Sequence, residues 1–544
     1  MRLTVPAQDV QEGSFVVIES GNWQFYGLVT DLLLGATDPR FADEQSESRL
    51  PPHLARLLHG QTLYTNLEVL LALMLERGPE PGSPEYTRWL AEHPEPPHPL
   101  PVKTLPPHHA PVSLAGEGDI AEIFGKASEA GNFVIGSTRE QGHPVCINLD
   151  RFIQRSSGVF GATGTGKSFL TRLVLAGLIH YNRAAVLVLD MHNEYGYDDT
   201  ASDTGRRVIG LKTKFPSRVR VVGLGQGALI RGQAPDYNLE IAMSDIQPED
   251  IELLTRELNL KETTPTVLEG LVSSFGRENW FAAFKEMENG AVIETEDGKK
   301  TPAPNSVAYW AIRAGVNVMA AEGLHSKLSR LFHKSYIVSR PAADTVSEII
   351  KSLEAGQHIV LSFGNFESDL DYLLVSNLLT RRIRQAWEDR TNTFRSKGEV
   401  EPRPLVIVLE EAHKLLNREM AAQTTFSTIA RELRKYYVTL LIVDQRPSQI
   451  YDEVMSQLGT RISGWLGDDD DIRAVLSGLA GREALRGMLA HLQAKEEVLL
   501  LGWGVPMPLP VRSRRYDEAF WDELLGKDNR KRDVAQNLKD LGFD

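Results

Sequence analysis

Short runs of β-branched and aromatic residues characterise the beginning of the chain. Ser14–Glu19 and Trp23–Asp31 are two such runs, and a turn-prone Ser-Gly-Asn triplet separates them, so they predict two strands joined by a turn. The leucine-rich stretch Asn66–Glu76 predicts a helix. Residues 78–112 are rich in proline and histidine and predict an extended connector.

The pattern of apolar residues changes near residue 155. Before it, Asn132–Ile135 and Pro144–Asn148 are two more strand-like pieces, so we expect residues 1–150 to form a β-rich, barrel-like domain. Beyond it, apolar strands alternate with amphipathic helices, which indicates an α/β fold with a parallel sheet covered on both faces. This pattern predicts a core made of residues 151–240 and 346–515, a helical insertion over 241–345 and a helical tail over 516–544.

Composition narrows the classes of protein that this chain can represent. Its 59 basic and 73 acidic residues give a net charge of −14, which argues against a surface coated with nucleic-acid-binding charge but leaves room for a localised basic channel. Cys146 is the only cysteine, so an intramolecular disulfide is impossible and a reducing compartment is expected. The apolar runs are too short to span a bilayer, and the amino end lacks a signal-peptide core. We therefore expect a cytoplasmic protein without a membrane partner.

A glycine-rich loop follows the first strand of the predicted core. It fits the pattern G-x-x-x-x-G-K-[ST], lies between the strand Ser157–Phe160 and the helical stretch Phe169–His180, and therefore predicts a nucleotide site. Its backbone N–H groups would surround the β-phosphate, the lysine would contact the β- and γ-phosphates, and the serine hydroxyl would bind Mg²⁺. The loop residues are Gly161, Ala162, Thr163, Gly164, Thr165, Gly166, Lys167 and Ser168.

Two further apolar strands end in acidic residues. Leu405–Leu409 is followed by Glu410 and Glu411, which fits a Walker B strand separated from the P-loop strand by an inserted neighbour. Glu410 would then help to hold Mg²⁺ and Glu411 would polarise the attacking water. Asp190 begins the sequence DMHNEY at the end of the strand after the P-loop helix, where parallel sheets bind their ligands. A simple turn is the alternative interpretation of that sequence.

Polar residues also surround a third strand, Thr439–Val443. Gln445 follows it, in a position suited to contacting the γ-phosphate. Arg434 precedes it at the end of a helix, where a cation is favourable next to the negative helix terminus. Arg434 could equally serve as an arginine finger for the nucleotide of a neighbouring subunit.

The combination of GATGTGKS, DMHNEY, LEEAHKLL and IARELRKYYVTLLIVDQRPS resembles the HerA branch of the HerA–FtsK ATPases over residues 120–510. The resemblance implies a RecA-like P-loop ATPase core with ATP and Mg²⁺ as cofactors, and a small β-barrel at the amino end. It also implies a homohexameric ring that drives double-stranded DNA through its pore. Members of the family commonly act with a NurA-type nuclease in end resection, and others serve in anti-phage complexes.

The resemblance also assigns roles to individual residues. Lys167 and Ser168 match the residues that bind phosphate and Mg²⁺, and Glu410 and Glu411 match Walker B. Asp190 belongs to the D-x-H-x-E-Y element. The remaining matches are Gln445 as the sensor, Arg434 as the trans-acting arginine and Arg155 as the basic residue before the P-loop strand.

Two functions remain open at this point. The chain is either a DNA-translocating motor or an ATP-gated ring that assembles and activates a partner effector with little translocation. A motor needs basic residues for the DNA backbone, and each candidate is also compatible with an ordinary surface charge. The candidates are Arg206, Arg207, Lys212, Lys214, Lys414 and Arg418, whereas Arg381, Arg382 and Arg384 are expected to form the polar face of a helix.

Overall fold

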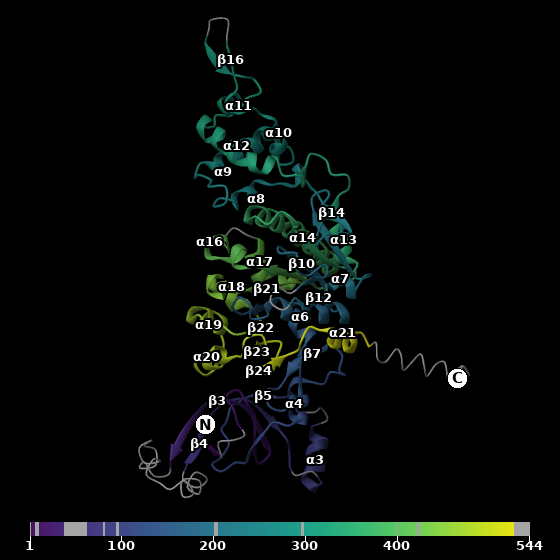
Figure 1. Cartoon of the computed structure of the whole chain (residues 1–544), viewed down its shortest axis with the longest axis vertical. Helices are drawn as coiled ribbons and strands as arrows, with labels where there is room; N and C mark the ends of the chain where they lie inside the picture. The colour runs from purple at the N-terminus through teal and green to yellow at the C-terminus, as the bar shows by residue number, and fades with distance from the viewer. Residues whose placement is uncertain are drawn as a thin grey trace, which may run out of the picture.

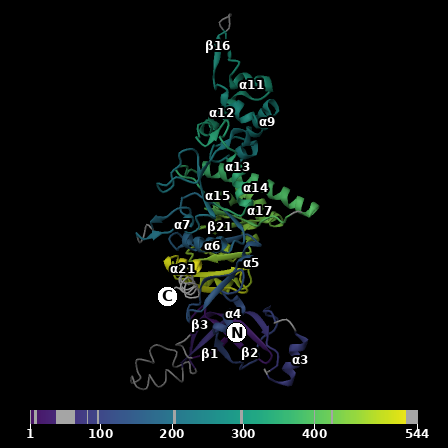
Figure 2. The same ribbon diagram turned by 90° about the vertical axis from the view of Figure 1, so that its right-hand side faces the viewer.

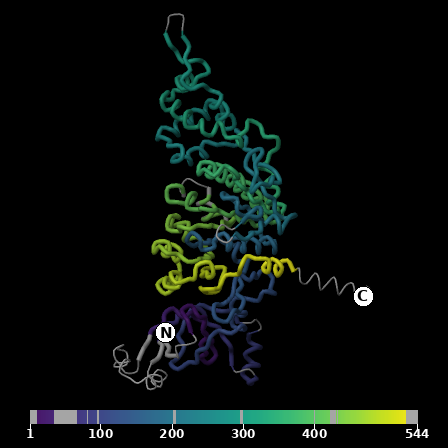
Figure 3. Tube along the Cα trace, viewed as in Figure 1, coloured from purple at the N-terminus to yellow at the C-terminus, as the bar shows by residue number. Residues whose placement is uncertain are grey.

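A computed structural model describes residues 2–5, 10–36, 63–79, 82–93, 97–200, 205–294, 299–398, 400–421 and 425–526. The molecule is elongated, with an amino-terminal sheet at one end, a helical insertion at the other and a large mixed sheet between them (Figures 1 and 2). The chain passes from the first sheet into the large sheet, leaves it to build the insertion, and returns to complete it (Figure 3). The α/β fold class predicted from the sequence is confirmed.

The amino-terminal sheet is antiparallel and has the strand order β1-β4-β3-β2-β6, with β5 paired to β4. Its two longest strands, β3 (Trp23–Ala36) and β4 (Leu63–Glu76), pair along their whole length. The helix predicted over Asn66–Glu76 is therefore wrong: pairing with β3 outweighs the helical preference of its leucines. Within the described residues β1 and β6 do not pair, so a closed barrel stays a prediction. The other strands are β1 (Arg2–Val5), β2 (Phe15–Ser20), β5 (Leu100–Pro101) and β6 (Val112–Leu114).

The predicted connector over residues 78–112 is not entirely extended. It contains α3 (Pro84–Glu92), whose first residue is proline and whose N-cap, Ser83, accepts a hydrogen bond from the backbone N–H of Tyr86. A proline with fixed φ suits the first helical turn, so this proline starts a helix where we had expected an extended chain.

The large sheet has the strand order β14-β13-β19-β10-β20-β21-β9-β22-β23-β24-β7-β8. Every neighbouring pair from β14 to β22 is parallel, and every pair from β22 to β8 is antiparallel. The parallel strands consist almost entirely of buried residues, as expected for a sheet with helices on both faces. In chain order the strands are β7 (Asn132–Ser137), β8 (Pro144–Asn148), β9 (Ser157–Phe160), β10 (Ala185–Asp190), β13 (Val219–Leu224), β14 (Tyr237–Leu239), β19 (His358–Ser362), β20 (Leu405–Glu410), β21 (Val438–Asp444), β22 (Thr460–Ser463), β23 (Glu497–Gly502) and β24 (Leu509–Ser513).

Strands β7 and β8 lie at the edge of the large sheet, because Arg512 and Ser513 of β24 pair with Ser137 and Gly136 of β7. The sequence prediction had assigned both strands to an amino-terminal domain over residues 1–150. Their short antiparallel pattern resembles that of the preceding strands, and only long-range pairing with β24 distinguishes them. The structure therefore ends the amino-terminal sheet before residue 132.

Helices cover the large sheet, and α14 continues from it to the insertion (Figure 1). Among the described residues no helix is both long and apolar enough to cross a membrane. The helices around the sheet are α6 (Lys167–Tyr181), α7 (Leu211–Lys214), α13 (Thr345–Glu354), α14 (Asp369–Lys397), α15 (His413–Leu416), α16 (Arg418–Ala421), α17 (Thr425–Glu432), α18 (Asp452–Gln457), α19 (Asp469–Leu476), α20 (Arg482–His491) and α21 (Glu518–Leu525).

The insertion is mainly helical and carries the hairpin β16–β17 at its tip (Figure 1). Buried aromatic residues, among them Trp280, Phe281 and Phe284, form its core. Its elements are α8 (Pro248–Glu252), α9 (Thr264–Phe275), α10 (Trp280–Glu286), β16 (Val292–Glu294), β17 (Lys300–Pro302), α11 (Val307–Ala314) and α12 (Val318–Phe332).

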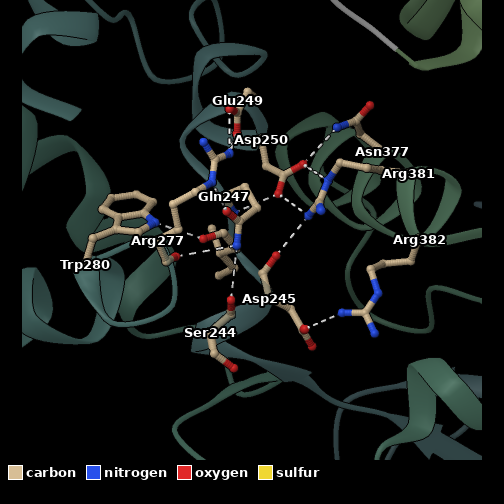
Figure 4. Close-up of polar contacts among 11 residues, drawn as sticks. Ser244, Asp245, Gln247, Glu249, Asp250, Arg277, Trp280, Asn377, Arg381 and Arg382 are labelled. Atoms are coloured by element: carbon tan, nitrogen blue, oxygen red, sulfur yellow. Dashed lines mark hydrogen bonds and ion pairs between the residues drawn. The ribbon is translucent and has the colours of Figure 1, made fainter. Parts of the chain in front are cut away.

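An ion pair with a buried carboxylate joins the insertion to α14 (Figure 4). Arg381 donates to Asp250, with 2.8 Å between Nη2 and Oδ2, and Asn377 donates to the other carboxylate oxygen at 3.0 Å. Next to it, Arg382 donates to Asp245 at 2.7 Å. Arg381 and Arg382 therefore do more than form the expected polar face of their helix, because their partners are carboxylates of a different segment. Arg384 pairs with Glu388 of the same helix, as such a face would.

The last of the described helices, α21, packs against the large sheet, where the rings of Phe520 and Phe133 of β7 lie 6.5 Å apart. Its Phe520 and Trp521 are buried, and the Trp521 ring lies against Phe215 with 5.6 Å between ring centroids. Part of the predicted helical tail is thus a packed helix. Residues 527–544, with the mixed-charge run that follows α21, lie outside the described residues.

Candidate nucleotide-binding site

The P-loop connects the buried strand β9 to α6. Gly164 and Gly166 have φ values of 78° and 93°, which residues with a Cβ rarely adopt, so the turn depends on glycine at both positions. The hydroxyl of Thr165 donates to the carbonyl of Ala162 at 2.7 Å and closes the loop on itself. The N–H groups that begin α6 therefore lie at the end of the parallel sheet, where they can receive a phosphate.

Lys167 is the first residue of α6, and its ammonium group lies within the loop, 3.4 Å from the carbonyl oxygen of Ala162. Burial lowers the pKa of Lys167, and the nearby carboxylates of Glu411, Asp444 and Glu194 oppose that shift. The lysine therefore lies between a loop that can bind phosphate and a group of carboxylates whose negative charge would repel phosphate.

Glu410 ends β20, a strand close to the P-loop strand β9. β21 lies between β9 and β20, so the predicted Walker B strand is separated from the P-loop strand by one inserted strand. Glu410 is buried at the end of β20, and its Oε2 has no hydrogen-bond partner within the described residues. Burial raises the pKa of Glu410 well above its ordinary value, and the carboxylates of Asp190 and Glu194 raise it further.

Glu411 has a different environment from Glu410. Its backbone is left-handed, with φ at 47°, a strained conformation that is often found at functional sites. Its Oε2 accepts a hydrogen bond from Nε2 of Gln445 at 2.6 Å. The predicted water-activating carboxylate and the predicted γ-phosphate sensor are therefore in direct contact.

Asp190 lies close to these residues but has a different set of contacts. Its carboxylate accepts hydrogen bonds from the backbone N–H groups of Glu194 (2.8 Å) and Tyr195 (3.0 Å) and from the hydroxyl of Ser362 (3.3 Å). Asp190 is fully buried, so these bonds shape the DMHNEY turn and direct Glu194 toward the site. The turn interpretation and the site interpretation of this sequence are therefore compatible.

Arg434 and Arg155 lie at the amino ends of the central strands, opposite the carboxyl ends where the P-loop lies. Arg434 precedes the seven-residue strand β21, whereas Gln445 follows it, and at about 3.3 Å per residue the strand separates them by roughly 20 Å. Arg155 precedes β9 in the same way, and its guanidinium group lies 4.3 Å from the centroid of the Trp503 ring. Both arginines line one cavity of about 460 Å³. Neither can reach a nucleotide on the P-loop of its own chain.

Comparison with known proteins was made by sequence and by structure. The family described as "Helicase HerA, central domain" matches residues 133–383. The chain is 24% identical over 533 residues to the DNA double-strand break repair helicase HerA of Saccharolobus solfataricus, covering 97% of this chain and 91% of that protein. It is also 24% identical over 529 residues to the protein of the same name from Sulfurisphaera tokodaii, covering 95% and 90%.

These matches support a HerA-type ATPase. Among solved structures it is similar to VirB4 of Thermoanaerobacter pseudethanolicus, with 15% identity, a TM-score of 0.43, and coverage of 72% of this chain and 98% of that one.

Two residues of the candidate site that the sequence did not single out are His413 and Asp444. Asp444 is buried and accepts hydrogen bonds from the backbone N–H of His413 (2.7 Å) and from its Nδ1 (2.9 Å). Although burial lowers the pKa of His413, the hydrogen bond and charge of Asp444 outweigh it and raise that pKa. The sequence did contain a signal for Asp444, because it is an acidic residue at the end of an apolar strand. We used that signal to select Glu410 but did not apply it to Asp444.

The candidate DNA-binding residues fall into two groups. Lys212, Lys214 and Lys414 are ion-paired with Asp236, Glu518 and Asp369, and Arg207 is paired with Asp198. Arg206 and Arg418 are exposed. Carboxylates of the same chain therefore lie beside the three lysines and Arg207, and contact of any of these six residues with DNA stays a prediction.

Proposed function

We propose that this HerA-type ATPase is an ATP-driven motor that moves double-stranded DNA, and that it works as a ring of six subunits. The observation that carries the proposal is the position of Arg434, which lies at the amino end of strand β21, whereas the P-loop lies at the carboxyl ends of the strands. An arginine that cannot reach its own nucleotide can complete the site of the next subunit, as arginine fingers supplied in trans do. Relatives named DNA double-strand break repair helicases support DNA as the substrate.

In this proposal the residues at the P-loop edge bind and orient ATP. Lys167 contacts the β- and γ-phosphates, and the backbone N–H groups from Gly161 to Ser168 surround the β-phosphate. Glu411 orients the attacking water and Gln445 contacts the γ-phosphate. Asp190 acts through Glu194, whose backbone it holds, and is therefore a positioning residue.

The residues at the site also fit Mg²⁺. Ser168 lies in the first turn of α6, and the buried Oε2 of Glu410 has no hydrogen-bond partner within the described residues. A hydroxyl and a carboxylate are the oxygen donors that Mg²⁺ takes in such sites. When bound, the ion would neutralise charge that develops on the phosphates, and we propose that Ser168 and Glu410 hold it.

The proposal extends to partners. We expect a NurA-type nuclease to act with the ring in DNA end processing. We also keep the expectation of a cytoplasmic location, which rests on the single cysteine.

An assembly platform for another effector is the second candidate. The insertion favours it, because it extends from the large sheet (Figure 1) and exposes several apolar side chains that a partner protein could cover. They are Val292, Ile293, Ile312 and Met319.

ATPase activity measured with and without duplex DNA, on protein sized by light scattering, tests the proposal. A motor should be hexameric and strongly stimulated by duplex DNA, and the stimulation should fall steeply with salt because phosphate contacts release counterions. A hexamer whose ATPase ignores DNA but responds to an added effector would favour the platform. A monomer with full ATPase activity would contradict both candidates.

A further inference from the structure

A second cavity lies beside the P-loop, and its lining residues have no role in the site described so far. It encloses about 530 Å³, within the range typical of small-molecule sites. Most of its lining comes from the turn before β23, the end of β24 with the residues that follow, and the β7–β8 hairpin, and Ala127 and Glu523 complete it. Its cationic residues are Lys495, Arg512, Arg514 and Arg515. We call it the basic cavity.

The basic cavity adjoins the start of α6 on two sides. A Cβ placed on Gly166 would lie 3.8 Å from the Cα of Lys495, so the turn before β23 runs directly past the P-loop. The rings of Phe169 and Tyr516 are 6.4 Å apart, so the segment after β24 packs against the first turn of α6. That turn is where the α-phosphate end of a bound nucleotide emerges from a P-loop.

The order of strands fixes which part of a nucleotide points toward the basic cavity. From β9, the Walker B strand β20 and the γ-phosphate sensor lie on the β21 side, whereas the basic cavity lies on the side of β22, β23 and β24. A triphosphate bound with its γ-phosphate toward Glu411 must extend its other end away from β20. We propose that the basic cavity binds the base and ribose of the nucleotide, an inference that rests on the proposed role of the P-loop residues.

The chemistry of the lining suits a nucleoside. Arg514 already has partners within the protein: it forms an ion pair with Glu523, and its guanidinium group lies 4.9 Å from the centroid of the Phe520 ring. Arg512 and Arg515 are exposed, and in the described part of the chain neither forms an ion pair. A guanidinium plane stacks on flat aromatic groups and donates hydrogen bonds to ribose and phosphate oxygens. These two arginines therefore form the recognition surface for base and ribose.

Binding of ATP and of inorganic tripolyphosphate to the full-length protein separates the nucleoside from the phosphates. The wild-type protein should bind ATP more tightly than tripolyphosphate. Arg512→Ala and Arg515→Ala should each weaken ATP binding by about 5- to 100-fold, the range that base stacking is worth on truncation to alanine, and leave tripolyphosphate binding unchanged. In turnover, KM for ATP should rise while kcat at saturating ATP stays the same.

Arg482→Ala is the matched control, because it removes the same charge from an exposed position on α20, and it should change neither affinity. Equal binding of ATP and tripolyphosphate by the wild-type protein would overturn the inference without any variant. Equal weakening of both ligands, or weakened duplex DNA binding with unchanged KM, would overturn it too. Failure of the proposed function is a separate result: Lys167→Ala would then retain binding of both ligands.

Discussion

The amide of Gln445 donates a hydrogen bond to the carboxylate of Glu411, with 2.6 Å between Nε2 and Oε2. The two residues follow adjacent strands, β21 and β20, so the register of the sheet brings them together. A γ-phosphate that attracts the amide would weaken this bond and release the carboxylate for the attacking water. In the proposed mechanism this one contact would couple the recognition of ATP to the activation of water.

The first prediction concerns Glu411→Gln. We expect this variant to bind ATP with nearly normal affinity and to hydrolyse it very slowly, because only the group that orients water is changed. Lys167→Ala should instead lose ATP binding, because it removes the charge on the β- and γ-phosphates. Equilibrium binding and single-turnover hydrolysis distinguish the two, and wild-type hydrolysis by Glu411→Gln would contradict the Walker B assignment.

The second prediction concerns the ring. Arg434→Ala should reduce turnover by about 10³- to 10⁵-fold and preserve nucleotide affinity, since an arginine finger stabilises charge that develops during transfer. Mixing it with Glu411→Gln protein should restore part of the activity at mixed interfaces if the subunits exchange.

Lys435→Ala is the control for the ring prediction, because Lys435 is the adjacent exposed cation. Equal losses in Arg434→Ala and Lys435→Ala would indicate a general effect of surface charge.

The third prediction concerns DNA. Arg418→Ala should weaken duplex binding similarly for all sequences and reduce the salt slope by about one unit, as expected for one lost phosphate contact. Lys214→Ala should leave the salt slope unchanged and loosen α21, because its Nζ lies 2.8 Å from Glu518 and 5.6 Å from the centroid of the Trp521 ring. Salt titrations of DNA binding, with limited proteolysis near α21, measure both. A changed slope in Lys214→Ala would return that lysine to the DNA path.

The fourth prediction concerns acid stability. Burial, with the nearby charges of Arg403 and Arg218, lowers the pKa of His358 to about 3. An unfolded chain takes up this proton near pH 6.5 while the folded chain does not, so the free energy of unfolding falls by about 1.4 kcal/mol per pH unit below 6.5. His358→Leu should flatten that dependence in unfolding experiments at pH 7 and pH 5. Parallel pH profiles for wild type and variant would contradict it.

The fifth prediction concerns the ion pair between the insertion and α14. Asp250→Asn should lower the free energy of unfolding by about 2–3 kcal/mol, because it leaves the guanidinium group of Arg381 without its buried carboxylate. Asp245→Asn is the matched control: the pair that Asp245 forms with Arg382 is more exposed and should be worth at most about 1 kcal/mol. Denaturant unfolding of both variants measures the difference, and equal effects would contradict the role of burial.

Local signals were sufficient to predict the strand, turn and helix of the P-loop and the strand that ends at Glu410. The P-loop combines a strand, a glycine turn and a helix within one short segment, and Glu410 ends an uninterrupted apolar strand, so both could be read without tertiary information. The failures all depend on distant partners. β4 is a strand because β3 pairs with it, β7 joins the large sheet because β24 pairs with it, and Arg381 is an ion-pair residue because Asp250 lies opposite.

Helix α14 contacts both the candidate nucleotide site and the insertion. Near its start, the hydroxyl of Tyr372 donates to the carbonyl of Glu410 at 2.8 Å, and two to three turns later Arg381 holds Asp250. A small tilt of α14 during the ATPase cycle would be amplified over the length of the insertion, as at the end of a lever. A fluorophore on the β16–β17 hairpin should therefore report the nucleotide state from the far end of the molecule.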